Sequence, residues 1–478
     1  MEHKIENTEE ATILEVTRII KKFQEIFRDK TSHTEGFLTI NELEILWSEL
    51  RNNTEVLYSD MIRQLLNTID ERDMVRKKKR EYADRGINLK TDRRAERTIL
   101  TLNGQLSYSR NILTPSDSTS RQRLAATEGI KSIAPLDVLF RMDKLPFKMT
   151  LATMLRATYW AQNQCSYQKA EEIMRGVYGI FINDDTIRQI TNYIGEIVFT
   201  EDCRKADDLY ALYNQGKMPY PQDKAGILYI ETDGAALNTR LKDENGSTWR
   251  ENKLGVVFSS DNIHSWYDKH NEKQHRILKR EYVSYIGSCS EFRKHLLSCA
   301  VKNGYGAYKE TVLLSDGAAW IRNLRDDIFP DAQHILDYFH LCENVYTFAK
   351  YLFGLDEEKY RPWAEDICKA LKKSNSNQVL KELLPFKDKK LPNCPINLYN
   401  YITNNVDNID YKKYLQCGYF IGSGAIESGN KLILQRRLKQ SGMRWNTKTA
   451  QFLLTLVSKE ESDLWNSEVL NSVLNYLS

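Results

Sequence analysis

Apolar residues recur at helical spacing near the start of the chain. They do so from 8 to 28 and again from 38 to 66, with Ile13, Val16 and Ile20 among the first set. A repeat of three to four residues predicts amphipathic helices. We therefore expect a helical region over residues 1–70, suited to self-association or to docking on the rest of the chain.

The pattern changes after Pro219 and Pro221, where short runs of β-branched and aromatic residues alternate with helical stretches. Such runs predict strands. We expect five strands, at 227–230, 254–258, 282–286, 311–314 and 334–339. Helices are expected at 291–301, 319–328 and 341–352. Three consecutive strands followed by alternating helices and strands predict an α/β (α+β) fold, a mixed five-stranded sheet flanked by helices.

The carboxyl-terminal part of the chain is helical by its pattern. A polar helical insertion is expected at 354–416, followed by a helix at 424–442 and a helical tail from 447. The predicted division of the chain is therefore 1–70, 71–145, 146–215, 220–353, 354–416 and 417–478.

The segment 71–145 is expected to hold a basic stretch, a β-hairpin and a linker. Residues 72–97 contain eleven Lys or Arg against five Asp or Glu. This excess would attract a phosphate backbone, or it is an ordinary solvated helix face. Alternating β-branched residues around Asn103-Gly104 predict a hairpin. The Ser/Thr-rich stretch 111–135, with Pro115 and Pro135, is interpreted as a linker or loop.

The segment 146–215 is expected to be helical and to contain a helix-turn-helix. Two periodic halves of 167–194 are separated by a stretch that contains Gly179, and the second helix begins near Asp184. In that arrangement Arg188, Gln189 and Asn192 would face a DNA groove. Helix pairs with a glycine turn are also common in proteins that bind no DNA, so both interpretations stay open.

Overall composition excludes little. The 68 basic and 65 acidic residues nearly cancel, so only local charge can indicate a partner. No apolar run of membrane-spanning length and no apolar signal core is present, so we expect a cytoplasmic protein. The eight cysteines form no C-x-x-C pair and are expected to be reduced. His295 and Cys299 could share a metal, but with no further paired ligands ordinary packing is the favoured interpretation.

Two predicted strands are followed by Asp-Gly, at Asp233-Gly234 and Asp316-Gly317. Each could be a simple turn after a strand. If the strands are neighbours, however, the two carboxylates meet at one edge of the sheet, where they repel unless a divalent cation neutralises them. Mg²⁺ or Mn²⁺ fits because these ions prefer oxygen ligands.

A third carboxylate is sought on the helix that begins at Gly424. Glu427 is placed with Lys431, Leu434 and Leu438 on the apolar stripe that faces the sheet, where a carboxylate needs a partner. Pairing with Lys431 is the simpler alternative. Glu231 competes for the same role because it lies two residues before Asp233. The helix does not form a phosphate-binding loop, since Asn430 occupies the required lysine position.

The rest of that helix is basic. Five Lys or Arg and no acid lie between 431 and 444, namely Lys431, Arg436, Arg437, Lys439 and Arg444. These side chains suit a nucleic-acid backbone, and Trp445 could stack on a base.

Together these residues resemble a known family. The acids of Glu231-Thr-Asp-Gly234, Leu314-Ser-Asp-Gly317 and Gly424-Ala-Ile-Glu427 resemble the Asp-Asp-Glu triad of insertion-sequence transposases. Asp337-Tyr-Phe-His340 resembles the Asp-x-x-His signature of the Mutator-like superfamily, and Arg437 to Trp445 resembles the region after its catalytic Glu. The resemblance covers residues 90 to 455.

The resemblance implies a ribonuclease-H-like core, with Asp233, Asp316 and Glu427 as ligands of two Mg²⁺ or Mn²⁺ ions. Asp337 and His340 would support the site, although His340 could equally be a core histidine paired with Asp337. The implied activity is cleavage and joining of double-stranded DNA at element ends by a homo-oligomer in the prokaryotic nucleoid, with no membrane association. The alternatives are a nuclease without strand transfer and a catalytically silent DNA-binding protein.

Overall fold

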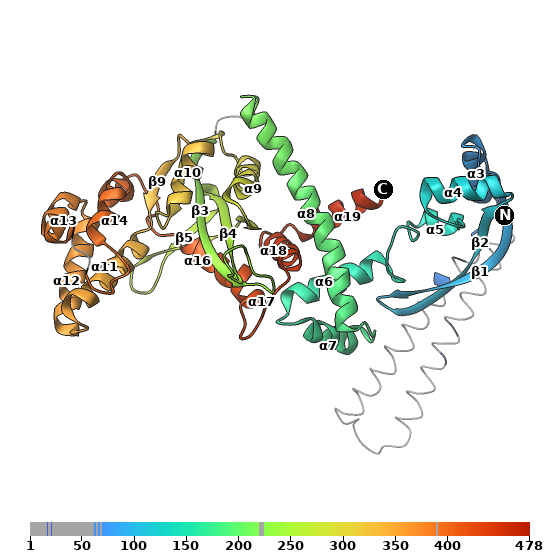
Figure 1. Ribbon diagram of the computed structural model, residues 1–478, viewed down its shortest axis with the longest axis horizontal. Helices are drawn as coiled ribbons and strands as arrows, with labels where there is room; N and C mark the ends of the chain where they lie inside the picture. Colours follow the sequence, from blue (N-terminus) through green and yellow to red (C-terminus); the bar gives the residue numbers. More distant parts are fainter. Residues whose placement is uncertain are drawn as a thin grey trace, which may run out of the picture. The chain divides into compact units, whose positions relative to one another are not determined.

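The computed structural model describes residues 69–218, 224–388 and 391–478, together with Thr17, Lys21, Ile62, Arg63 and Leu66. The helices predicted within 1–70 therefore lie almost wholly outside the described residues. By their contacts the residues divide into two compact units, 1–191 with 475–478 and 192–474. The boundary falls inside the long helix α8 (Asp184–Asn214), which is drawn in green in Figure 1.

The first unit contains the predicted hairpin. Helix α3 (Arg72–Asp84) carries the basic run and precedes β1 (Leu89–Thr101) and β2 (Gly104–Pro115). The two strands pair antiparallel from Leu89 opposite Pro115 to Thr101 opposite Gly104. Gly104 has a φ of 96°, a conformation that is strained for any residue with a side chain. The hairpin predicted from Asn103-Gly104 is therefore confirmed.

The predicted linker at 111–135 is wrong. Residues up to Pro115 belong to β2, and 118–128 form helix α4 (Ser118–Glu128). The serines and the aspartate that suggested a loop cap this helix instead, since the Asp117 carboxylate accepts from the Ser120 N–H at 2.7 Å. Helix α5 (Pro135–Leu139) follows, with its proline in the first turn, where no donor is lost.

A buried charge cluster joins α5 to the hairpin. The Asp137 carboxylate, 4% exposed, accepts from Arg97 Nη1 and from Arg110 Nε at 2.7 Å each, and from the Tyr108 hydroxyl at 2.6 Å. Two guanidinium groups on adjacent strands thus depend on one carboxylate for neutralisation. A buried ion cluster of this kind is costly to break, because the remaining charges stay out of water.

We predict that Asp137→Ala destabilises the first unit by about 3–5 kcal/mol, because it leaves Arg97 and Arg110 without their counter-charge. Hydrogen exchange of the 89–115 peptides in urea measures this unit separately. Glu172→Ala is the matched control, since it removes an exposed i,i+3 pair with Lys169 and should cost less than about 1 kcal/mol. Equal losses in the two variants would contradict the role given to Asp137.

Three helices complete the segment that was predicted to be a helix-turn-helix. They are α6 (Leu151–Asn163), α7 (Tyr167–Tyr178) and α8. Helix α7 ends at Gly179, in the left-handed conformation, and α8 begins at Asp184 as expected. Helix α8, however, does not end at Ile194 as predicted. It continues for twenty more residues, to Asn214.

The second unit is built on a five-stranded mixed sheet. Its strands are β3 (Lys224–Asn238), β4 (Trp249–Ser259), β7 (Glu281–Ile286), β8 (Tyr308–Ser315) and β9 (Gln333–Leu336). Their order in space is β7-β4-β3-β8-β9. The β3, β4 and β7 strands are antiparallel neighbours, whereas β8 and β9 run parallel to β3. The predicted mixed sheet is confirmed.

Helices cover both faces of this sheet (Figure 1). On one face, α9 (Cys289–Lys302) and α10 (Ala319–Ile328) bury an apolar cluster that includes Leu228, Ile230 and Leu313 of the strands. On the other face lie α16 (Gly424–Gly429) and α18 (Thr447–Glu461). The α18 helix also covers the edge strand β7, where the Gln451 side chain accepts from the Ile286 N–H and donates to the Ser284 carbonyl.

The helical insertion is confirmed. Residues 354–416 contain α12 (Glu357–Lys372), α13 (Ser376–Leu383), α14 (Leu398–Asn404) and α15 (Tyr411–Gln416), and they follow α11 (Tyr338–Phe353), the helix predicted at 341–352. The fifth strand was predicted too long. Residues 337–339 start α11 instead, because the Asp337 side chain caps that helix.

One element of the second unit was not predicted. A two-stranded hairpin, β5 (Ile263–Tyr267) and β6 (Lys273–Ile277), is inserted between β4 and β7. Its residues are mostly exposed and polar on both faces, so they lack the alternation that marks a half-buried strand.

Candidate functional site

Asp233 and Asp316 meet on neighbouring parallel strands. The β3–β8 ladder pairs Glu231 with Leu314, two residues before each aspartate, and the charge of Asp316 is close enough to raise the pKa of Asp233. The prediction that β3 ends at Asp233 is wrong, because the strand continues to Asn238 against β4. Asp233 is therefore not part of a turn, and its carboxylate projects from the middle of a strand.

The Asp233 carboxylate is held by two donors. Its Oδ1 accepts from the Gly234 N–H at 2.7 Å, and its Oδ2 accepts from Asn430 Nδ2 at 2.6 Å. Burial raises the pKa of Asp233, and the nearby charge of Asp316 raises it further, against these hydrogen bonds and His340. The raised pKa of Asp233 thus reflects burial and also the repulsion between two nearby carboxylates that the sequence predicted.

Asp316 follows β8 directly, and its conformation depends on Gly317. Gly317 has a φ of 81°, and a Cβ there would lie 2.7 Å from the Leu336 side chain and 2.9 Å from that of Asn405. The Asp316 carboxylate accepts from the Ala318 N–H at 2.9 Å, and its carbonyl accepts from the Tyr401 hydroxyl at 2.9 Å. Only glycine fits this position, which accounts for the Asp-Gly pair.

Glu427 lies in the first turn of α16 and is exposed, as is Lys431. The prediction that both share the sheet-facing stripe with Leu434 and Leu438 is wrong. A π-helical stretch (Asn430–Gln435) follows α16 and has a wider turn, so the two leucines are buried while Glu427 and Lys431 face solvent. Glu427 is consequently accessible to a substrate.

Glu231, the competing third acid, is 1% exposed. Its Oε2 accepts from the Ile426 N–H at 2.8 Å, so it caps the start of α16. Burial raises the pKa of Glu231 to about 8, with the charges of Asp337 and Glu427 adding to the effect. A buried carboxyl that holds a helix end is a poor ligand for an incoming metal, which favours Glu427.

Asn430 is a site residue that was not predicted from the sequence, where it served only to exclude a phosphate-binding loop. Besides its contact with Asp233, its Oδ1 is buried and has no hydrogen-bond partner among the described residues. Gly429 makes this reach possible, because a Cβ there would lie 2.6 Å from the Tyr282 ring. The E-S-G-N sequence was the available signal, since glycine permits close approach of the helix to the sheet.

Asp337 and His340 have different positions. Asp337 is 1% exposed, caps α11 through the His340 N–H at 2.8 Å, and accepts from the Ser423 N–H at 2.6 Å and from its hydroxyl. It thereby ties the start of α11 to the segment before α16. The His340 ring is exposed, lies 3.6 Å from Glu343, and is close enough to Asp233 to affect its pKa. The alternative of a core histidine is wrong.

The donor set suits a hard divalent cation. Asp233, Asp316 and the unpartnered Asn430 Oδ1 are all oxygen donors, which Mg²⁺ and Mn²⁺ prefer. Within residues 69–218, 224–388 and 391–478, however, no three His, Cys, Asp or Glu side chains are grouped closely enough to hold an ion. The charge of Asp316 acts on Asp233, and Glu427 is exposed on α16.

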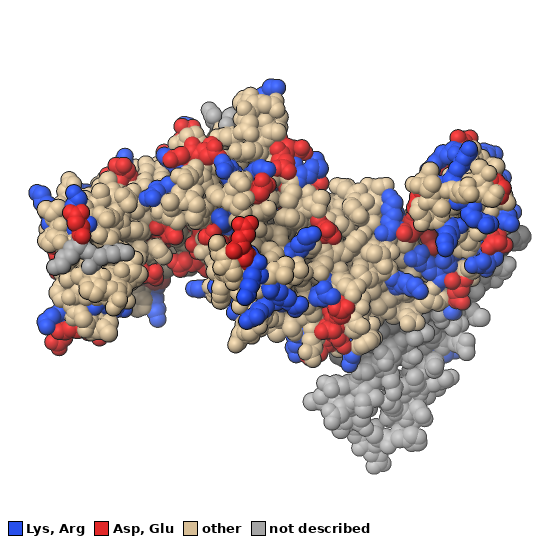
Figure 2. Space-filling view, in the orientation of Figure 1, with Lys and Arg blue, Asp and Glu red and all other residues tan. Residues whose placement is uncertain are grey.

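Exposed basic residues surround the helix after Glu427. Lys431, Arg436, Lys439 and Arg444 are all exposed, and Figure 2 shows Lys and Arg gathered over the segment around α17 (Arg436–Leu438). Of these four, Arg436 lies 3.6 Å from Glu461. These side chains stay candidates for contacts with a phosphate backbone.

Arg437 and Trp445 point inward instead. Arg437 is 2% exposed and its guanidinium lies 5.0 Å from the centre of the Trp445 ring. Trp445 is 9% exposed, donates from Nε1 to the Leu438 carbonyl, and bridges to Thr239 beyond the end of β3. The Trp445 ring is therefore used to fasten this loop to the sheet, and it is not available to stack on a base.

Arg188 and Gln189 lie on the first turns of α8, in the first unit. Arg188 pairs with Asp185 at 2.6 Å, and Gln189 donates to the same carboxylate at 2.7 Å. Both side chains are partly or fully exposed. A DNA groove would have to compete with Asp185 for them.

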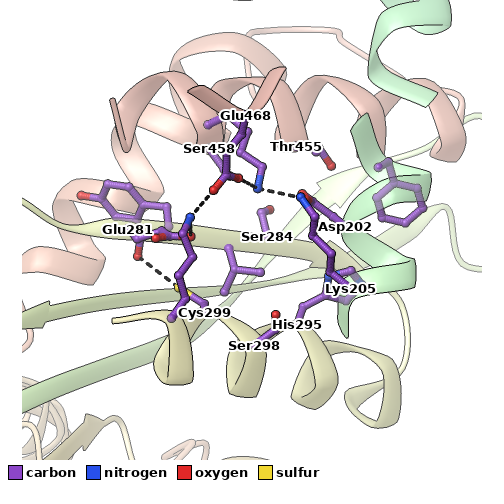
Figure 3. A pocket seen from close by; sticks show the side chains of 15 residues that line it. Asp202, Lys205, Glu281, Ser284, His295, Ser298, Cys299, Thr455, Ser458 and Glu468 are labelled. Atoms are coloured by element: carbon purple, nitrogen blue, oxygen red, sulfur yellow. Dashed lines mark hydrogen bonds and ion pairs between the residues drawn. The ribbon is translucent and has the colours of Figure 1, made fainter. Parts of the chain in front are cut away.

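A pocket at the β7 edge holds a further cluster of ionisable groups (Figure 3). Lys459 bridges Asp202 and Glu468, and Lys302 also reaches Glu468. Although burial opposes its charge, Lys459 with Lys302 lowers the pKa of Glu468 to about 2. Since these charges neutralise one another, the cluster holds α8, α9 and the C-terminal helices to the sheet.

His295 and Cys299 line this pocket as packed side chains. The His295 ring stacks on Phe199 and lies 5.2 Å from that of Tyr285. Burial lowers the pKa of His295 and raises that of Cys299, so the thiol stays protonated. Their spacing reflects one buried face of α9.

Comparison with known proteins adds no relative. No protein-family model matches the chain, and no curated protein matches it with significant similarity. Among the described helices, none has the length and apolar character needed to span a membrane.

We predict that Glu231→Gln changes the pH dependence of stability. The folded pKa of about 8 exceeds the usual 4.5, so stability contributed by the neutral carboxyl is complete below 4.5 and lost as the pH rises through 8. The glutamine variant stays neutral and should match wild type at pH 4 but unfold at a higher temperature at pH 9. Calorimetry in EDTA measures this, with the exposed Glu358→Gln as control. Parallel pH profiles for wild type and Glu231→Gln would disprove the burial effect.

We also predict that the two classes of basic-segment residue behave differently. Lys439→Ala with Arg444→Ala should weaken DNA binding and reduce its salt dependence, because exposed cations release counterions. Trp445→Ala should instead destabilise the fold by about 3–5 kcal/mol. Fluorescence anisotropy at several salt concentrations and urea unfolding separate the two effects. A fully stable Trp445→Ala variant with weakened binding would reverse the assignment.

Proposed function

We propose that this protein is a DNA transposase that cuts phosphodiester bonds at the ends of an insertion sequence and joins them to target DNA. The observation that carries the proposal is the pair of Asp233, on β3, and Asp316, which directly follows the adjacent parallel strand β8. Two like charges at one position on a sheet are unfavourable without a cation to bind. The sequence resemblance to Asp-Asp-Glu transposases supports the same function.

The strand order supports a ribonuclease-H-like assignment. Numbered within the sheet, the strands lie in the order third, second, first, fourth, fifth, with the first three antiparallel and the last two parallel to the first. The proposed ligands come from the first strand, the end of the fourth strand and a helix after the insertion. This is the arrangement that the resemblance implies.

On this proposal, Asp233, Asp316 and Glu427 would hold two Mg²⁺ or Mn²⁺ ions. When bound, these ions would activate water or a DNA 3′-hydroxyl and stabilise the leaving oxygen. Asn430 keeps the Asp233 carboxylate in one orientation, and Glu231 fixes the start of the helix that carries Glu427. The exposed Glu427 would complete the ligand set from the substrate side of the site.

The DNA would lie along the exposed cations after Glu427. Lys431, Lys439 and Arg444 are accessible and come from the same segment as the proposed third ligand. Positive charge next to a carboxylate site suits a substrate that is itself a polyanion. Double-stranded DNA is therefore the proposed partner, bound by a homo-oligomer as the resemblance implies.

We predict that Asp316→Asn lowers metal-dependent DNA cleavage by more than about 100-fold, since even outer partners of a metal ligand contribute 10- to 100-fold. Nicking of supercoiled plasmid in Mn²⁺ measures this without knowledge of the end sequence. Asp331→Asn, at an exposed position before β9, is the matched control and should retain activity. Full nicking by Asp316→Asn would exclude the proposed site.

Joining is tested separately from cutting. A pre-cut duplex that carries the DNA flanking the coding segment is incubated with target plasmid and Mn²⁺. Covalent insertion of the duplex supports a transposase. Cleavage without insertion would instead indicate a nuclease, and DNA binding without either reaction would indicate a silent DNA-binding protein.

A further inference from the structure

The β5–β6 hairpin has no role in the site described above, yet its surface is unusual. Between 263 and 280 it carries five Lys or Arg against two Asp or Glu. Two of its aromatic side chains are exposed, Trp266 by 41% and Tyr267 by 65%. Large exposed rings on a protruding, basic ribbon indicate a surface that binds something.

The acidic charge of the hairpin is largely committed to its own turn. The Asp268 carboxylate accepts from the backbone N–H groups of His270 and Glu272 at 2.8 and 2.9 Å, and from Gln274 at 3.0 Å. By contrast, the cations Lys269, Lys273, Arg276 and Lys279 form no ion pair within the described part of the chain. The ribbon therefore presents unneutralised positive charge on a turn that its own hydrogen bonds shape.

One face of the ribbon carries a pair of stacked rings. His264 and Trp266 lie on the same face, and their rings are stacked with centres 5.8 Å apart and planes at 22°. Arg276 stands directly across the ladder from His264. Adjacent planar rings with a flanking guanidinium suit the stacking of unpaired bases, while cations follow the phosphates.

The other face anchors the ribbon next to the carboxylate site. His275 lies edge-on to Phe420 at 5.1 Å, and Phe420 lies 5.1 Å from Tyr229 of β3. Tyr229, Glu231 and Asp233 are two residues apart in sequence, so their side chains lie on the same face of that strand. Four residues of strand span about 13 Å, so Tyr229, which contacts the hairpin's neighbour Phe420, lies about 13 Å along β3 from Asp233.

We propose that the β5–β6 hairpin binds single-stranded DNA next to the catalytic site, with His264 and Trp266 as the stacking platform. The inference rests on the proposed function for its substrate, since a cut or frayed DNA end at Asp233 supplies unpaired bases within reach. Charge complementarity favours a polyanion over a neutral partner, and the exposed rings favour unpaired bases over a duplex.

The test compares single-stranded and duplex oligonucleotides of one sequence by fluorescence anisotropy, with the full-length protein in EDTA. Trp266→Ala should weaken binding of the single strand by between about fivefold and a hundredfold, with duplex binding little changed. Tyr351→Ala removes a similarly exposed ring from α11 and is the matched control. Lys273→Ala with Arg276→Ala should also weaken binding, whereas Lys381→Ala with Lys387→Ala, on the insertion, should not.

Photocrosslinking identifies the contact directly. A single strand that contains bromodeoxyuridine should crosslink to a peptide spanning 264–273 in wild type, and the yield should fall in Trp266→Ala. Unchanged binding and crosslinking would overturn the proposal, as would an equal loss for single strand and duplex. A Trp266→Ala variant that changes only the sedimentation coefficient would instead assign the surface to a second copy of the chain.

The assay is independent of the cleavage reaction. It contains no metal, so single-strand binding is measured whether or not the protein cleaves DNA. Absence of plasmid nicking by the wild-type protein would therefore disprove the enzymatic proposal and leave the hairpin result standing. Conversely, active enzyme with an inert hairpin would disprove only the hairpin proposal.

Discussion

The parallel pairing of β3 with β8 is the constraint on which the candidate site depends. It places Asp233 beside Asp316 although the two residues come from segments far apart in the chain. The pairing has an electrostatic cost, visible in the raised pKa of Asp233. Burial of Leu228, Ile230 and Leu313 beneath α9 and α10 is what holds the strands in this register.

The second requirement is the position of α16, which three contacts set from different directions. Glu231 caps its start from β3, Asp337 holds the preceding segment through Ser423, and Gly429 lets the helix approach Tyr282. These residues position the helix that carries Glu427, but they are not themselves proposed metal ligands. The site is therefore supported by buried acids that are different from the acids proposed to carry the chemistry.

The same separation of roles applies to the basic segment. Arg437 and Trp445 fasten the loop after α17 to the end of β3, and this leaves Lys439 and Arg444 on the surface. One set of residues in the basic segment is therefore buried and holds the fold, while the other set is exposed and could contact a polyanion. The β5–β6 hairpin adds a second basic surface near the other end of β3, so the proposed DNA contacts flank the carboxylates.

The sequence by itself determined the elements whose signals are local. Periodicity located the five strands, Asn103-Gly104 the first hairpin, and the two Asp-Gly pairs the candidate aspartates. It could not determine which side of a helix is buried once a π-helical stretch changes the turn, so Glu427 was wrongly grouped with Leu434 and Leu438. Trp445 was misplaced because its burial depends on contacts with Arg437, Leu438 and Thr239. It also missed the β5–β6 hairpin, whose residues are exposed on both faces, and the contact of Asn430 with Asp233. Only tertiary structure decides such features, because burial and long-range hydrogen bonds depend on segments that are distant in sequence.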